Sequence, residues 1–193
     1  MNRRLPALRC IKVGKRSSFP RRHRDFYPTP EAAVERLLDH IEPGTTFYEP
    51  CAGDGSLTRH LEDGGLVCVG QSDIAPRGDG IDRLDAFELE DAPGEIFVTN
   101  PPWTRTDMHA LIEHLASMKK PTWMLIDADW MHTKQAGRFF IGGNRHTCFQ
   151  IVSVGRLKWI PGSKNTGKDN CCWYGFGAFL GGDEAAFFHR NGH

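Results

Sequence analysis

The sequence predicts a single α/β domain built on a mostly parallel sheet that ends in an antiparallel hairpin. Between residues 25 and 141, short apolar stretches of strand length alternate with stretches in which apolar residues recur at helical spacing. The last part of the chain instead holds two long stretches of strand character, 149–162 and 171–182, joined by a polar loop. A chain of 193 residues is long enough for one such domain with a sizeable core.

The first half of the domain is expected to alternate helix and strand. Residues 25–41 have helical spacing of apolar residues, with Thr29 as the expected N-cap and Pro30 in the first turn. The further expected elements are a strand over 44–50, a helix over 55–65 and a second buried strand over 66–70.

The second half continues the alternation and then changes character. The expected elements are a strand over 95–99, a helix over 107–120, a strand over 121–127, a helix over 130–141 and the two closing strands. Parallel α/β sheets bind their ligands beyond the carboxyl ends of the strands, so functional residues are expected there.

The charge distribution divides the chain into an arm and a domain. Residues 1–24 carry nine of the 24 basic residues and no acid, so residues 25–193 hold 15 bases against all 24 acids. A basic, flexible arm on an acidic domain is typical of proteins that bind nucleic acid, although a solvated terminus has the same composition.

Cysteine usage and hydropathy indicate a cytosolic protein. The six cysteines lack zinc-type spacing, and we expect reduced, mostly buried thiols. There is no apolar run near eighteen residues and no signal-peptide pattern, so we expect no membrane association.

Glycines and acids follow the first expected strand. Gly53 and Gly55 allow a tight turn and close approach of a ligand to the backbone. The motif is neither a P-loop nor a full dinucleotide fingerprint, and two glycines also suit a simple strand–helix turn. Glu49 and Asp54 beside them would repel a pyrophosphate and attract an ammonium or sulfonium group.

Carboxylates also follow the next strands. Asp73 lies eighteen residues after Gly55, where a carboxylate can accept hydrogen bonds from both ribose hydroxyls of an adenosine; a turn-forming aspartate is the alternative. Asp85 can accept an adenine amino proton, and Phe87 can pack on the ring.

The stretch "VTNPPW" ends the strand over 95–99. Proline cannot donate to a β-ladder and extends the residue before it, so Asn100, Pro101, Pro102 and Trp103 should form a stiff loop at the strand's carboxyl end. A proline-rich turn with a core tryptophan is the structural alternative.

Taken in order, "EPCAGDG" (49–55), Asp73, Asp85 and "NPPW" (100–103) resemble the motif series of class I S-adenosylmethionine-dependent methyltransferases. "FYPTP" (26–30) resembles the motif that closes over the methionine end of the cofactor in amino-group DNA methyltransferases. The similarity is greatest to phage-type adenine-N6 methyltransferases and covers roughly residues 25–180. It implies a Rossmann-like, seven-stranded sheet with a reversed hairpin at its edge.

The resemblance implies S-adenosylmethionine as cofactor, DNA as substrate, no metal, and a location in a bacterial or phage-infected host cytoplasm. It assigns the cofactor to Tyr27, Thr29, Pro30, Glu49, Cys51, Ala52, Gly53, Asp54, Gly55, Asp73, Asp85, Ala86, Phe87 and Asn100. It assigns catalysis to Asn100, Pro101, Pro102 and Trp103. The Asn100 oxygen and the Pro101 carbonyl would accept the two N–H groups of the target amine, and Trp103 would stack on its base.

Several alternatives stay open at this point. Adenine or guanine in RNA, cytosine N4 and a protein glutamine amide also present a planar amine, and a non-catalytic nucleic-acid-binding module can share the fold.

Only the arm, a 104–108 loop, the stretch 141–150 and a 161–171 loop with Lys164 and Lys168 are left for reading flanking bases, so we expect short sequence specificity. His109, His114 and His132 are expected to be surface or satisfied residues, while Trp130 and Met131 fit either the base pocket or the core. The oligomeric state is left open, with a monomer as one possibility.

Overall fold

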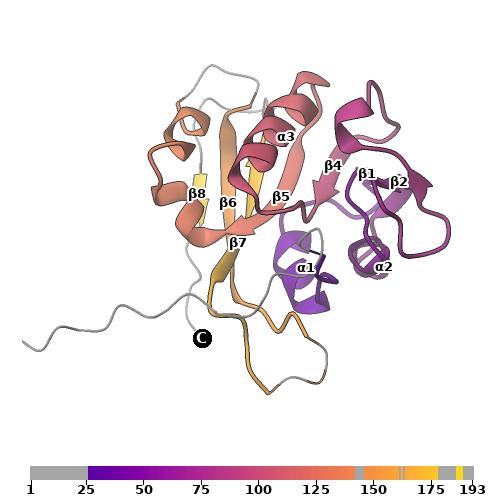
Figure 1. Cartoon of the computed structure of the whole chain (residues 1–193), viewed down its shortest axis with the longest axis horizontal. Helices are drawn as coiled ribbons and strands as arrows, with labels where there is room; N and C mark the ends of the chain where they lie inside the picture. Colours follow the sequence, from indigo (N-terminus) through magenta and orange to yellow (C-terminus); the bar gives the residue numbers. More distant parts are fainter. Residues whose placement is uncertain (1–25, 142–145, 161, 163, 178–185, 189–193) are drawn as a thin grey trace, which may run out of the picture.

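The computed structural model describes residues 26–141, 146–160, 162, 164–177 and 186–188, and it shows one sheet between two layers of helices (Figure 1). The helical elements are α1 (Glu31–Leu38), α2 (Ser56–Asp63), α3 (Arg105–Ser117) and the 3-10 turns η2 (Ala86–Glu88), η3 (Ala128–His132) and η4 (Ala136–Phe139). The strands are β1 (Thr46–Glu49), β2 (Val67–Asp73), β3 (Asp82–Arg83), β4 (Ile96–Thr99), β5 (Thr122–Asp127), β6 (Cys148–Arg156), β7 (Asn170–Phe176) and β8 (Ala186–Phe188).

Within the described residues, eight strands form one sheet in the order β3-β2-β1-β4-β5-β7-β6-β8. The first five of these are mutually parallel, and β7 is antiparallel to both β5 and β6. This confirms the expected seven-stranded, mostly parallel sheet with an antiparallel C-terminal hairpin. The short β8, which lies parallel to β6 at the outer edge, was not predicted.

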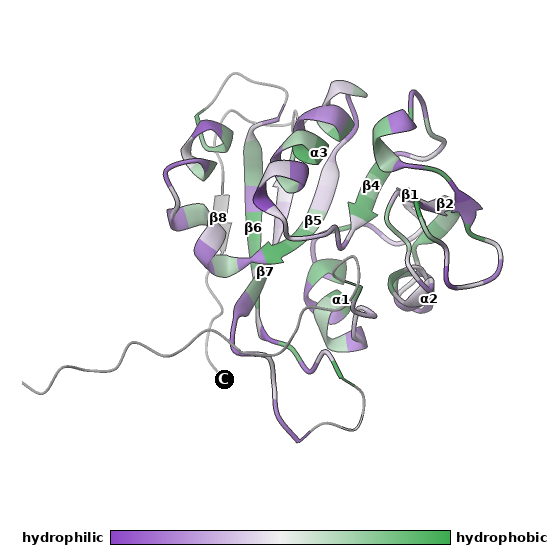
Figure 2. Cartoon of the chain, in the orientation of Figure 1, coloured by the Kyte–Doolittle hydropathy of each residue, from purple (hydrophilic) through white to green (hydrophobic). Residues whose placement is uncertain are grey.

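The alternation of side chains along the strands supplies both halves of the core. Phe97 and Met124 point toward the layer that contains α3, while Val98 and Leu125 point toward α1 and α2. Buried strands that face helices on both sides are apolar throughout, and the central strand β4 is drawn mostly green in Figure 2 for this reason.

The loop that joins β6 and β7 lies at the edge of the sheet where the parallel strands have their carboxyl ends. In the antiparallel register, Asp127 at the end of β5 lies opposite Cys171 at the start of β7. The loop between β6 and β7 therefore lies at the same edge as the carboxyl ends of β1, β2, β4 and β5.

Four expectations about individual elements were wrong. The N-cap of α1 is Pro30, because the Thr29 hydroxyl instead accepts a hydrogen bond from the Asn100 side chain. The stretch 130–141 forms 3-10 turns in place of an α-helix. Residues 105–108 belong to α3 and not to a loop. The second strand is only partly covered, with Val67 and Val69 exposed, because its outer neighbour β3 has two residues.

The thiols agree with the expectation as far as they are described. Cys51, Cys68, Cys148, Cys171 and Cys172 form no disulfides, and the last three are buried. Cys10 and the rest of the basic arm lie outside the described residues. Among the helices of the described part, none is long and apolar enough to cross a membrane.

Candidate active site

A cavity of about 290 Å³ opens beyond the carboxyl ends of β1, β2 and β4. Its walls come from the segment 26–29, the turn after β1, the end of β2, residues 85–87, the loop after β4 and the inner face of α3. These segments are far apart in the sequence, and the strand order β2-β1-β4 makes them neighbours.

The turn after β1 depends on its glycines. Gly53 and Gly55 both have positive φ angles, 59° and 75°, which residues with a Cβ adopt only with strain. A Cβ on Gly53 would also lie 2.6 Å from the ring of Phe26, so the segment before α1 packs directly on the turn. Arg77 stacks on the same ring, 4.1 Å from its centre, and lines the cavity with Phe26.

The Asp73 carboxylate fixes the turn against the end of β2. One oxygen accepts a hydrogen bond from the Gly53 amide (2.9 Å) and the other from the Ala75 amide (2.7 Å). These bonds hold the carboxylate in one orientation at the cavity wall, where each oxygen has a second lone pair for a ligand hydroxyl.

Glu49 is a buried acid inside this cavity. Only 1% of it is exposed, and it accepts a hydrogen bond of 2.8 Å from the Thr58 hydroxyl. Burial, with smaller repulsion from Asp73 and Asp54, raises the pKa of Glu49 from 4.5 to about 8. A ligand cation beside it would relieve that cost and favour the ionised carboxylate. Burial likewise raises the pKa of the neighbouring Cys51 thiol to about 12, which disfavours its thiolate form.

Residues 85–87 form part of the cavity wall. The Asp85 carboxylate accepts a hydrogen bond from the Phe87 amide (3.0 Å) and caps the 3-10 turn η2. Ala86 is buried, while the Phe87 ring is 45% exposed and tilts against His114 at 5.9 Å. An aromatic face is therefore exposed beside a carboxylate at the cavity wall, and its contact with an adenine ring stays a prediction.

The loop after β4 presents its asparagine to the same cavity. The Asn100 side-chain nitrogen donates to the Thr29 hydroxyl oxygen at 3.1 Å, and Thr29 is only 5% exposed. Because the nitrogen is engaged by Thr29, the Asn100 carbonyl oxygen is the atom that can accept an N–H group from a ligand.

The other members of the loop lie differently. Pro102 lines the cavity, whereas Pro101 is buried and Trp103 lies outside the lining. The Trp103 indole N–H donates to the Leu125 carbonyl (3.0 Å), and its ring packs edge-on against Trp159 at 5.7 Å. Tyr27 lies in the lining and also contacts Trp159, at 6.1 Å, while Pro30 and Gly55 are outside the lining.

Sequence reasoning missed several residues of the site. Phe26 begins the "FYPTP" motif and could have been selected with it, but no pattern marks Arg77. Leu57, Met108 and Leu111 read as ordinary apolar positions of helices, yet they also line the cavity. Trp159 comes from a hairpin more than fifty residues after the NPPW loop, so only the fold reveals their contact.

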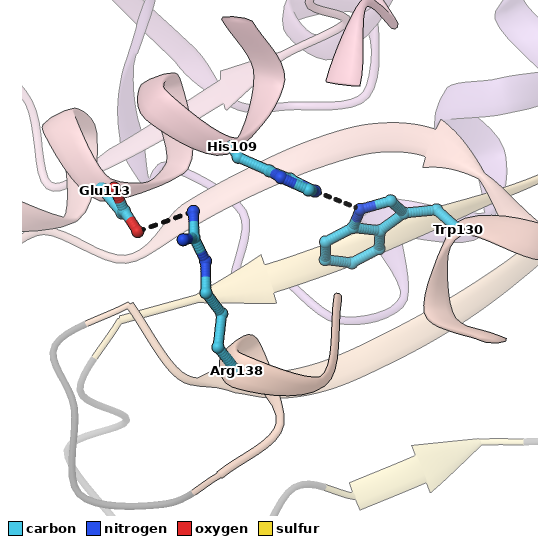
Figure 3. A network of polar contacts seen from close by, with 4 residues as sticks. All are labelled: His109, Glu113, Trp130 and Arg138. Carbon is cyan, nitrogen blue, oxygen red and sulfur yellow. Dashed lines mark hydrogen bonds and ion pairs between the residues drawn. The ribbon is translucent and has the colours of Figure 1, made fainter. Parts of the chain in front are cut away.

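Figure 3 shows the surroundings of His109 and Trp130, which lie outside the cavity lining. The Trp130 indole donates to His109 Nε2 at 2.9 Å, and Arg138 pairs with Glu113 at 2.9 Å. Burial, with repulsion from Arg138 and Arg105, lowers the pKa of His109. Trp130 is 1% exposed, so its place is the core and not a base pocket.

In the part of the chain that the structure describes, no group of three His, Cys, Asp or Glu side chains could hold a metal ion.

Comparison with known proteins places the fold. No protein-family model matches the sequence, and no curated protein matches it. Among solved structures, a Pyrococcus horikoshii protein proposed to be an RNA methyltransferase is similar with a TM-score of 0.52 and 15% identity, covering 84% of this chain and 91% of that one.

A second similar structure is protein 1320 of Thermoplasma acidophilum, with a TM-score of 0.51 and 14% identity; 75% of this chain and 84% of that one are covered. At such identities the similarity is one of fold. The chain therefore has the Rossmann-like methyltransferase fold that its motif series implied.

Proposed function

We propose that this chain is an S-adenosylmethionine-dependent methyltransferase that methylates the N6 amine of adenine in DNA. One observation carries the proposal: Asn100 of the NPPW loop faces the same cavity as the glycine turn and its carboxylates. A cofactor site and an acceptor for an amine thus share one space, as methyl transfer requires.

The residues of the cavity fit the cofactor's chemistry. Asp73, oriented by two backbone amides, suits the ribose hydroxyls, and Asp85 with Phe87 suits an adenine ring. Glu49 and Asp54 would attract the ammonium and sulfonium charges, and a bound cation would offset the burial that raises the pKa of Glu49. When bound, the cofactor supplies an electrophilic methyl group.

The chain's own contribution to the reaction is positioning. The Asn100 oxygen, which lines the cavity, accepts one N–H group of the target amine and directs its lone pair toward the methyl group; Pro101 does not line the cavity, so the second contact, to its carbonyl, is expected from the motif alone. Transfer of the methyl group that the bound cofactor would supply would leave a positive charge on the amine nitrogen, and loss of one proton to solvent would remove it. The Thr29 contact holds Asn100 in the required orientation. Trp103, the last residue of the loop, is expected from the motif to stack on the target base, but its ring lies outside the cavity lining and against Trp159.

DNA is proposed as the acceptor because the motif series is most similar to adenine DNA methyltransferases and because the arm is strongly basic. The target amine is inaccessible inside a duplex, so the base must be unpaired or flipped out. RNA is the competing acceptor, since the first solved structure above is proposed to act on RNA.

Incubation of the protein with methyl-labelled cofactor and matched DNA, RNA and protein acceptors tests the proposal. We expect label in DNA, recovered as N6-methyladenine by mass spectrometry of the nucleosides. Asn100→Ala, whose partner is the acceptor, should abolish transfer while leaving cofactor affinity in calorimetry nearly unchanged. Label confined to RNA or protein would overturn the choice of substrate, and cofactor binding without any transfer would favour a non-catalytic module.

A further inference from the structure

The hairpin loop between β6 and β7, whose described residues are 157–160, 162 and 164–169, reaches beyond the sheet at the carboxyl ends of the strands (Figure 1). It lies at this edge because the start of β7 is opposite the last residue of β5. From Arg156 to Asp169 the chain has four basic residues and one acid. Arg156, Lys158, Lys164 and Lys168 are all exposed.

The charge of this loop contrasts with the cavity beside it. The cavity lining holds four aspartates, Asp54, Asp73, Asp85 and Asp107, against one basic residue, Arg77; Glu49, whose pKa burial raises to about 8, also lines it. A phosphate backbone is repelled from that side and attracted to the hairpin side. A polyanion that delivers one base to Asn100 therefore has a favourable approach along the loop.

An aromatic cluster ties the loop to the candidate active site. The half-buried Trp159 packs edge-on against Trp103 of the NPPW loop at 5.7 Å and against Tyr27 at 6.1 Å. The return arm of the loop is folded over the indole, because the Gly167 amide donates to the Leu157 carbonyl at 2.7 Å. A Cβ on Gly167 would lie 3.0 Å from the indole, so the loop and Trp159 are closely packed.

We propose that this hairpin loop is the docking surface for the nucleic-acid strand next to the target base, and that Trp159 is the positioning residue that fixes it against the NPPW loop. The loop cations contact phosphates, and bases beside the target meet the aromatic cluster. This inference rests on the proposed function, and it places strand recognition on the domain itself, apart from the basic arm.

Binding of a fluorescein-labelled, single-stranded DNA of mixed sequence, followed by anisotropy, tests the docking surface directly. Lys158→Glu and Lys164→Glu should each weaken binding at least about fivefold at low salt and reduce the log–log salt slope by roughly 0.7 per lost contact. Lys119→Glu is the matched control, since it makes the same charge change at an exposed site between α3 and β5, at the opposite edge of the sheet.

The two outcomes differ clearly. Loss of binding in the hairpin variants but not in Lys119→Glu supports the proposal. Equal affinities in all three variants, or no binding of single-stranded nucleic acid by the unmodified protein, overturns it. Because this measurement needs no methyl transfer, a protein that binds through the hairpin yet transfers no methyl group would contradict the proposed function alone.

The role of Trp159 needs a separate measurement. Trp159→Ala should raise KM for DNA about tenfold or more, while cofactor affinity in calorimetry stays within about twofold, because the indole does not itself line the cavity and meets it only through Tyr27. Trp159→Phe keeps an aromatic face and should restore most of the affinity. A Trp159→Ala protein with a lower Tm but an unchanged KM would reduce Trp159 to a structural residue and refute its positioning role.

Discussion

Among the residues that the structure describes, the Thr29 hydroxyl accepts a hydrogen bond from the Asn100 side-chain amide and so holds it in place. Thr29→Val keeps the shape of the side chain but removes the acceptor, so the amide loses its preferred orientation. We expect kcat to fall about tenfold, the equivalent of one ordinary hydrogen bond. Steady-state kinetics would measure this, with Thr29→Ser as the control that retains the hydroxyl. Equal kcat in the Val and Ser variants would show that Asn100 is oriented by something else.

Glu49 should make stability depend on pH. Its pKa rises from 4.5 in the unfolded chain to about 8 in the folded protein, so the folded state binds the extra proton between these values. The stability that this group contributes is therefore complete below pH 4.5 and is lost as pH rises through about 8. Glu49→Gln mimics the protonated form and can still accept from Thr58.

We expect Glu49→Gln to raise Tm at about pH 8.5 more than at about pH 5.5 in thermal unfolding followed by circular dichroism. The comparison with the unmodified protein at each pH removes the contribution of other titrating groups. A Tm difference that does not change between the two pH values would mean that Glu49 is already ionised in the folded protein.

At the scale of elements, the glycine turn can be tested with a matched pair. Gly53→Ala places a Cβ at positive φ and 2.6 Å from the Phe26 ring, whereas Gly44→Ala has φ of 85° with no atom within 4 Å. Both should lose about 1–2 kcal/mol of stability from backbone strain. Only Gly53→Ala should also weaken cofactor binding in calorimetry, because it displaces the segment that lines the cavity. Equal cofactor affinities in the two variants would separate the turn from the binding site.

Elements with strong local patterns were predictable, and contacts between distant segments were not. The apolar run before Pro101 and the glycines around Asp54 sufficed to place β4 and the turn after β1. The N-cap of α1 was misassigned because the Thr29 hydroxyl is engaged by Asn100, seventy-one residues away. The stretch 130–141 was predicted to be helical, but it forms two short 3-10 turns, in which Trp130 and Phe139 are buried.

For the candidate site, the sequence marked residues whose type is unusual at a strand end, such as Asp73 and Asn100. It could not mark Arg77 or Trp159, since ordinary surface and core positions contain the same residue types. It also could not show that the Trp103 indole donates a hydrogen bond to the Leu125 carbonyl, because only the strand order places β5 next to β4 and its loop.

At the scale of the whole molecule, the arm should govern attraction to nucleic acid. Removing residues 1–24 deletes nine basic residues and no acid, leaving an acidic domain. We expect a sharply raised KM for DNA and a lower salt slope, by roughly 0.7–0.9 per lost phosphate contact, with a far smaller change in kcat. Methylation rates against DNA concentration at two salt levels would measure both. Tyr27, Thr29 and Pro30 must be retained, and identical KM values and slopes would reduce the arm to a solvated tail.

The three buried thiols give the molecule a built-in reporter of its own opening. Burial raises the pKa of Cys148, Cys171 and Cys172, so little of the reactive thiolate exists in the folded state. All three lie in the antiparallel strand pair β6–β7, whose closed end carries the hairpin loop. Alkylation at these positions should therefore require that pair to open, and its rate should follow the fraction of molecules in which the pair is open when reclosing is fast. Slower alkylation in the presence of bound nucleic acid would then measure, at each cysteine, how far the substrate stabilises the closed sheet.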